Sequence, residues 1–157
     1  MAYAKDTSVP VSRSKAALEK LLLEHGATGI LTGWDDEIRR QMVSFKMPIP
    51  GGSLVCRLNC PMPSESDRDI CMTPGGKNRS SNQVDAAMEQ ANRSRWRTLL
   101  LKVRAKLEWI EISGTTFEEE FLSDVVMGDG LTISEKVLPQ LPALSQGAQL
   151  MLGPGAG

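Results

Sequence analysis

The residues with the clearest potential for chemistry in this sequence are its three cysteines and its single histidine. Cys56, Cys60 and Cys71 could supply thiolates to a zinc ion, and His25 could add an imidazole. The C-x2-C spacing of common zinc sites is absent, however, and His25 stands at a predicted helix end far from the cysteines. An odd number of cysteines without an export signal also argues against a disulfide framework. We therefore expect three free thiols, with neither a metal ion nor another cofactor.

Two further patterns could support catalysis or phosphate binding. Asp35, Asp36 and Glu37 are adjacent acids, but no histidine or nucleophile stands at a spacing that completes an acid–base constellation. The stretch 73–77, TPGGK, lacks the G-x4-G-K-[ST] spacing and the preceding strand of a phosphate-binding loop. The sequence thus predicts turn or loop residues at both places, and it predicts no enzyme activity.

The distribution of charge is more informative than the net charge of −1. Residues 38–106 carry 13 basic and 5 acidic groups, whereas residues 107–157 carry 1 basic and 8 acidic groups. The basic excess favours a polyanion, DNA or RNA, as the partner of the middle segment. The alternative is that the acidic part folds back and neutralises it.

The longest predicted helix concentrates cations beside its apolar stripe. A projection at about 100° per residue places Arg93, Arg97 and Arg104 within about 40° of one another. The opposite flank carries Arg95, Lys102 and Lys106. Such long side chains either cover the edges of the core and pair with acids, or contact phosphates. The second interpretation predicts weak binding of nucleic acid without strong sequence preference through Arg93, Arg97 and Arg104, assisted by Arg40 and Lys46.

The elements that must position these residues follow from periodicity and capping signals. The composition, 41% hydrophobic and 24% charged residues in a chain of 157, is typical of one globular core. We expect an α+β fold with a helix from Ser12 or Ser14 to about His25, strands at 28–34, 38–47 and 53–60 in an antiparallel meander, a long helix from near Val84 to about Ile112, and short helices capped by Thr115 and Thr132. Residues 1–11 form an extended arm, 12–141 the domain with a flexible loop at 61–82, and 142–157 a disordered tail.

Alternation within the predicted middle strand separates a core face from an exposed face. Val43, Phe45 and Met47 share one face, and Arg40, Ser44 and Lys46 share the other. In the next strand, Cys56 and Cys60 are four residues apart and share a face, where small buried residues are common. The long helix is expected to bury Trp96, Leu99, Val103, Leu107 and Ile110.

The location of the protein can also be predicted from the sequence. No apolar run approaches the roughly 20 residues of a membrane span. The first 15 residues lack the apolar stretch of a secretory signal. We therefore expect a cytoplasmic protein that does not contact the membrane.

Four separated blocks, YAKDTSVPVSRSK, HGATG with GWD, RWRTLLLKVRAKLE and TTFEEEFL, resemble a widespread family of small, functionally uncharacterised proteins encoded by tailed bacteriophages and prophages. The resemblance covers roughly residues 2–140 and implies the cytoplasm of a host cell as the location. It supplies no catalytic residues. The stretch PIPGG at 48–52 replaces a compact basic hairpin of the family, which weakens any function that depends on that hairpin.

Two functions are compatible with these observations. The first is a non-enzymatic phage accessory protein that binds nucleic acid or a nucleoprotein complex through the basic central segment. Its predicted helix–strands–helix order resembles that of the double-stranded-RNA-binding domain and, more loosely, that of phage single-strand annealing proteins. The alternative is a protein-binding module that inhibits a host or anti-phage defence protein. The oligomeric state stays open at this point.

Overall fold

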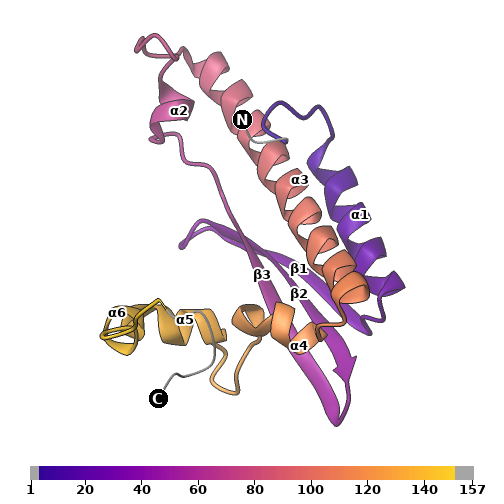
Figure 1. Ribbon diagram of the computed structural model, residues 1–157. Helices are drawn as coiled ribbons and strands as arrows, with labels where there is room; N and C mark the ends of the chain where they lie inside the picture. The colour runs from indigo at the N-terminus through magenta and orange to yellow at the C-terminus, as the bar shows by residue number, and fades with distance from the viewer. Residues whose placement is uncertain (1–3, 151–157) are drawn as a thin grey trace.

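The computed structural model of the protein describes residues 4–150. The elements follow the predicted order, which confirms the α+β class (Figure 1). In chain order they are α1 (Val11–Glu24), β1 (Gly29–Asp35), β2 (Arg40–Ile49), β3 (Gly52–Pro61), α2 (Arg68–Cys71), α3 (Ser81–Ser113), α4 (Phe117–Glu120), the 3-10 turn η1 (Leu122–Asp124), α5 (Ile133–Val137), the 3-10 turn η2 (Leu138–Gln140) and α6 (Leu141–Leu144). Within the described range, no helix is both long and apolar enough to cross a membrane.

The three strands form an antiparallel meander in the order β1-β2-β3. Phe45, at the middle of β2, lies opposite Ile30 of β1 and Cys56 of β3, and it is buried. Lys46 is exposed, as the alternation of the strand predicts. We call the face that carries Phe45 the inner face of the sheet and the other the outer face.

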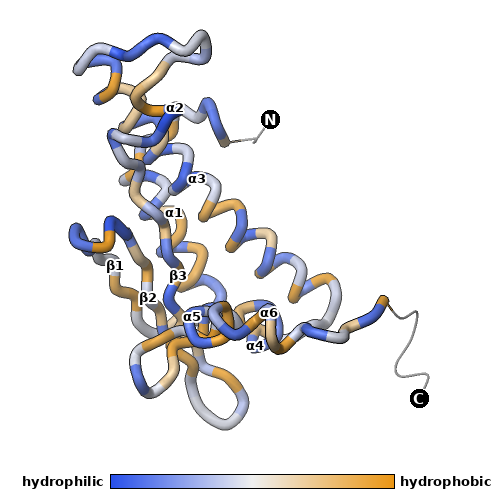
Figure 2. Tube along the Cα trace, turned by 90° about the vertical axis from the view of Figure 1, so that its left-hand side faces the viewer, coloured by the Kyte–Doolittle hydropathy of each residue, from blue (hydrophilic) through white to orange (hydrophobic). Residues whose placement is uncertain are grey.

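Helices α1 and α3 cover the inner face (Figure 1). Hydropathy alternates along α3 because its apolar positions recur once per turn (Figure 2). The predicted stripe of α3 is confirmed for Trp96, Leu99, Val103 and Leu107, whereas Ile110 is only partly buried. Leu100 joins them in the core, together with Leu18 and Leu22 of α1.

Two side-chain hydrogen bonds connect β2 to α3 across the inner face. The indole Nε1–H of Trp96 donates to Gln41 Oε1 at 2.9 Å. The Gln41 amide in turn donates to Asn92 Oδ1 at 2.7 Å. These bonds satisfy polar atoms that would otherwise destabilise the core, and they fix where α3 lies on the sheet.

Helix α3 is longer than the sheet that it covers. Its 33 residues span about 50 Å, and its N-terminal part extends past the sheet beside α2 (Figure 1). The helix begins three residues before the predicted start near Val84. Ser80 caps it through a bond from Gln83 N–H, and Gly114 ends it at φ 74°.

The start of α1 differs from the prediction. The helix begins directly after Pro10, and neither Ser12 nor Ser14 caps it. Proline has its φ fixed near the helical value and lacks an N–H, so it can stand at the helix start without a side-chain cap. Ser14 is instead a buried helix residue.

The C-terminal segment wraps around the β3 edge of the sheet. Phe121, next to α4, is fully buried, with its ring 6.1 Å from that of Phe45 on the inner face. Val126 N–H then donates to Val55 O of β3 at 2.8 Å, and the chain continues to the outer face. Leu122 is exposed, because α4 ends at Glu120 and the tight 3-10 turn directs Leu122 outwards.

Two predicted capping boxes fall in this C-terminal segment. The box at Thr132 and Glu135 is confirmed. The first box is wrong by one residue, because Thr116 and Glu119 form it in place of Thr115 and Glu118. Thr115 and Thr116 each stand three residues before a glutamate, so both registers satisfy the same sequence pattern.

The predicted loop at 61–82 has local structure. It contains α2 and a bridge between Met72 and Asn78. Arg79 connects its two ends by donating to Asp69 O at 3.0 Å.

The predicted domain limit at residue 141 falls at the start of α6, which ends beyond it. Residues 1–3 of the predicted arm and 151–157 of the predicted tail lie outside the described part of the chain.

The three thiols are free, but their accessibilities differ. Cys56 and Cys60 are buried on the inner face, and Cys71 is partly exposed in α2. Burial raises the pKa of the Cys56 thiol to about 12 and that of Cys60 to about 11. Both are therefore protonated and inaccessible at neutral pH.

We expect N-ethylmaleimide to label one thiol of the folded protein and three thiols after unfolding. Intact-mass spectrometry at neutral pH measures the number of adducts. A C71S variant should take up no label while folded. Two or three adducts in folded C71S or wild-type protein, at a rate close to that of the unfolded chain, would contradict the burial of Cys56 and Cys60.

Candidate nucleic-acid interface

The flank of α3 that carries the arginine row is turned towards α1. At the N-terminal end of the two helices, the Gln90 amide donates to Lys5 O at 3.0 Å and to Thr7 O at 2.9 Å. At the C-terminal end, His25 Nε2 lies 3.2 Å from Glu111 Oε1. The two helices therefore run side by side in the same direction, and residues of α3 between Gln90 and Glu111 on the same flank lie along the edge between them.

Arg97 and Arg104 lie on this flank, two helical turns apart. Both are partly exposed. Within residues 4–150, neither guanidinium takes part in a hydrogen bond or an ion pair. Their positive charges are therefore available to an external anion.

Arg93, the third member of the predicted row, is already engaged. Its Nη2 donates to Gln90 Oε1 at 2.6 Å, and its Nη1 lies 3.7 Å from Glu89 Oε2. The bond to Gln90 also connects it to the side chain that holds the N-terminal arm. Arg93 thus has a local structural role. At this position the first interpretation holds, in which the arginine covers the edge of the core and pairs with an acid.

Arg40 does not join the row, because β2 directs its side chain to the outer face. Glu135 of α5 binds it there, with Arg40 Nη1 3.1 Å from Glu135 Oε1 and Arg57 Nη2 2.6 Å from Glu135 Oε2. Arg57 also donates to Gly130 O at 3.0 Å. The structure therefore separates Arg40 from the arginines of α3, and its assistance in nucleic-acid binding stays a prediction.

Lys46 also lies on the outer face and is exposed. The sheet separates it from the α1–α3 edge, so one duplex or strand lying along that edge would not contact it directly. The five predicted site residues thus fall on two sides of the sheet. Arg97 and Arg104 remain together, whereas Arg40 and Lys46 are elsewhere.

The opposite flank of α3 is used mainly by the fold. Arg95 donates to Pro61 O at 2.7 Å, and Lys106 donates to Glu120 O at 2.8 Å. Lys106 also lies 3.5 Å from Asp124 Oδ2. Lys102 is exposed. The helical repeat puts it on this flank, but the sequence does not single it out as a site residue.

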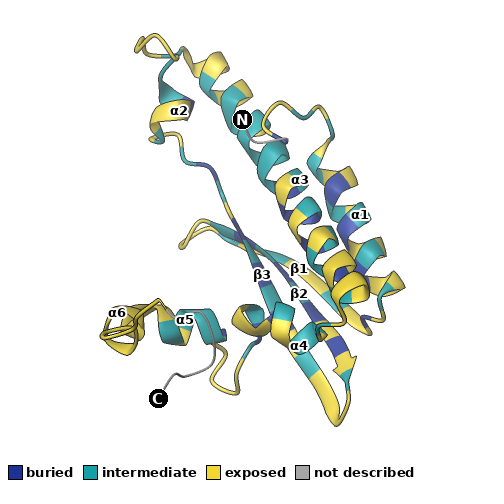
Figure 3. Cartoon of the chain, viewed as in Figure 1, coloured by how far each residue is buried: buried dark blue, intermediate teal, exposed yellow. Residues whose placement is uncertain are grey.

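The solvent face of α3 lies between Lys102 and the two unpaired arginines. Thr98 and Ala105 are exposed there, and exposed positions recur along α3 (Figure 3). This surface, defined by Arg97, Thr98, Lys102, Arg104 and Ala105, is called the α3 surface below.

The acidic C-terminal segment neutralises part of the basic middle segment. Glu135 binds two of its arginines, and Asp124 binds Lys106. The sequence does not indicate the ion pair of Arg57, because its partner is 78 residues away and no local spacing predicts such a contact. Much of the charge asymmetry is therefore internal to the fold, and the α3 surface is a smaller cationic area than the sequence predicts.

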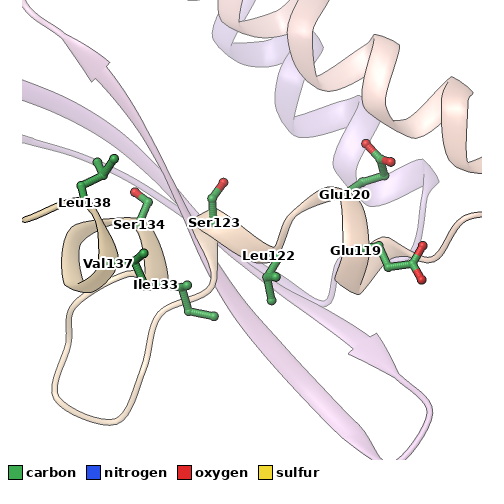
Figure 4. A pocket seen from close by; sticks show the side chains of 8 residues that line it. All are labelled: Glu119, Glu120, Leu122, Ser123, Ile133, Ser134, Val137 and Leu138. Carbon is green, nitrogen blue, oxygen red and sulfur yellow. The ribbon is translucent and has the colours of Figure 1, made fainter. Parts of the chain in front are cut away.

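A shallow hollow of about 330 Å³ lies between α4 and α5. It is lined by Glu119, Glu120, Leu122, Ser123, Ile133, Ser134, Val137 and Leu138 (Figure 4). The two glutamates lie at the α4 end, well away from Ser134 (Figure 4). None of the lining residues is a histidine, cysteine or lysine. In the part of the chain that the structure describes, no three His, Cys, Asp or Glu residues are placed to hold a metal ion.

Comparison with known proteins gives no match: no family model, curated protein or solved structure is significantly similar to this chain.

Proposed function

We propose that this protein is a non-enzymatic accessory protein that binds DNA or RNA through the α3 surface, in the context of phage replication or recombination. The observation that carries the proposal is that Arg97 and Arg104 have no ion-pair or hydrogen-bond partner within residues 4–150, while exposed Lys102 lies across the solvent face of the same helix. Guanidinium groups favour bidentate contacts to phosphate, and a lysine adds a point charge. The phage context rests on the family resemblance of the sequence blocks.

The geometry limits what such binding can achieve. Three cations support about three phosphate contacts, and each contact releases counterions when the nucleic acid binds. No exposed aromatic residue belongs to the α3 surface, so base stacking adds little there. We therefore expect weak, salt-sensitive binding without strong sequence preference.

Fluorescence anisotropy with labelled single- and double-stranded DNA and RNA tests this proposal. The logarithm of the binding constant should fall with the logarithm of salt concentration with a slope of about −2 to −3, as expected for three phosphate contacts. Absence of binding by folded protein to all four probes at low salt would overturn the proposal.

The second candidate, a protein-binding module that inhibits a host or defence protein, is favoured by a different observation. Trp109 and Ile112 stand one turn apart near the C-terminal end of α3, with 53% and 80% of their surface exposed. Exposed aromatic residues of this kind are common centres of protein interfaces. This function becomes the better account if the four nucleic-acid probes do not bind.

A further inference from the structure

The two edges of the sheet differ in their backbone hydrogen bonding. The β3 edge is covered, since Val126 N–H donates to Val55 O and Val125 bridges to Cys56. Strand β1 forms the other edge, and within residues 4–150 nothing but β2 pairs with it. Its outward N–H and C=O groups are therefore available to another strand.

Strand β1 lacks the features that usually prevent edge pairing. It contains no lysine and no proline, and its register with β2 is continuous over all seven residues without a bulge. Its only charged residue is Asp35 at the C-terminal end. Leu31 is 75% exposed and Trp34 is 69% exposed. An unprotected edge with exposed apolar side chains favours pairing with another chain.

We propose that the occupant of this edge is β1 of a second copy of the protein, paired antiparallel about a two-fold axis at Thr32. The two three-stranded sheets then form one continuous sheet of six strands. A two-fold axis perpendicular to the sheet pairs residues of the same face, and a centre at Thr32 uses the whole strand from Gly29 to Asp35.

The side chains of β1 are complementary to themselves in this register. Leu31 of one copy lies opposite Gly33 of the other, where the glycine leaves room for the leucine. Ile30 lies opposite Trp34, which pairs two apolar side chains on the inner face. By symmetry, each of these pairs occurs twice.

The charges are complementary as well. Asp35 of the second copy lies opposite Gly29, whose neighbour on β2 is Lys46. All three positions are on the outer face, and Gly29 has no side chain to separate the carboxylate from the ammonium group. Lys46 is exposed and has no ion pair among the described residues. The register thus gives this lysine an acidic partner in the other copy.

Disulfide trapping tests both the interface and its register. In a C71S background, T32C places two cysteines directly opposite each other, at a Cα separation of about 4.5–5.5 Å. A disulfide requires about 4.4–6.8 Å. L31C is the matched control, because the two copies of residue 31 are diagonal neighbours at about 7–8 Å. Cys56 and Cys60 are buried and do not interfere.

We expect T32C to form a covalent dimer under mild oxidation, and L31C to form little. In sedimentation velocity experiments, wild-type protein should shift towards a dimer as its concentration rises. An L31K variant, changed at an exposed position, should remain folded and monomeric. A T32C variant that stays uncrosslinked, a more efficient L31C crosslink, or an L31K variant that dimerises like wild type would each overturn the proposal. None of these measurements involves nucleic acid, so they stand apart from the test of the α3 surface.

Discussion

Replacement of Trp96 by alanine is expected to lower the free energy of unfolding by about 3–5 kcal/mol. The indole is fully buried at the centre of the cluster between α1, α3 and the sheet. Its removal leaves a large cavity, which the surrounding side chains can fill only in part. It also removes the donor that binds Gln41 Oε1, and an unpaired buried amide oxygen adds to the loss.

Urea denaturation followed by far-UV circular dichroism measures this loss. The matched control is W109A, because Trp109 lies on the same helix with half of its surface exposed. Its replacement should change the free energy of unfolding by about 0.5 kcal/mol or less. A loss below about 1 kcal/mol in W96A would contradict the position assigned to Trp96 in the core.

Removal of the Glu135 charge is expected to cost about 1–3 kcal/mol at neutral pH. Glu135 holds α5 to the outer face by binding both Arg40 and Arg57. Without its negative charge, the two guanidinium groups lose the carboxylate that they share. The three side chains are 19–29% exposed, so water screens part of the interaction. E135Q removes the charge but keeps an oxygen that can accept from Thr132 N–H in the capping box. E135A removes both and should be less stable than E135Q.

The cost of E135Q should depend on pH. The hydrogen bond from Thr132 N–H, followed by the charges of Arg57 and Arg40, holds the pKa of Glu135 below its ordinary value. A lowered folded-state pKa contributes stability above the unfolded pKa of about 4.3, and this contribution is lost as the pH falls through the folded pKa.

The difference in stability between wild type and E135Q should therefore be largest near neutral pH and shrink under acidic conditions. Denaturation curves of both proteins across this range measure it. E118Q, which removes a glutamate that forms no ion pair within residues 4–150, should resemble wild type throughout. An E135Q variant as stable as wild type at neutral pH would show that the two arginines do not need this carboxylate.

The order of elements and the inner face of the sheet could be predicted because they depend on local patterns. The alternation of β2 separates Phe45 from Lys46 without any knowledge of the rest of the chain. The stripe around Trp96 follows from the helical repeat. Helix α2 could not be predicted in the same way, because four residues are too few to display a period.

The composition of the candidate site was predictable only in part, because it depends on contacts between distant residues. The helical projection correctly groups Arg97 with Arg104, since both belong to one helix. It cannot indicate that Arg40 is bound by Glu135, which is 95 residues further along the chain. Nor can it indicate that Gln90 turns towards the N-terminal arm and engages Arg93. The fold therefore divides a charge cluster that appears continuous in the sequence.

The most direct test of the α3 surface compares the salt dependence of nucleic-acid binding in two double variants. R97Q/R104Q removes the two unpaired arginines, and K46Q/K77Q removes two exposed lysines from the outer face and the loop before α3. Because each phosphate contact contributes about 0.7–0.9 to the slope, R97Q/R104Q should flatten it by about 1.5 while folding is retained, and K46Q/K77Q should leave it unchanged. An unchanged slope in R97Q/R104Q, or an equal reduction in both variants, would contradict binding at the α3 surface.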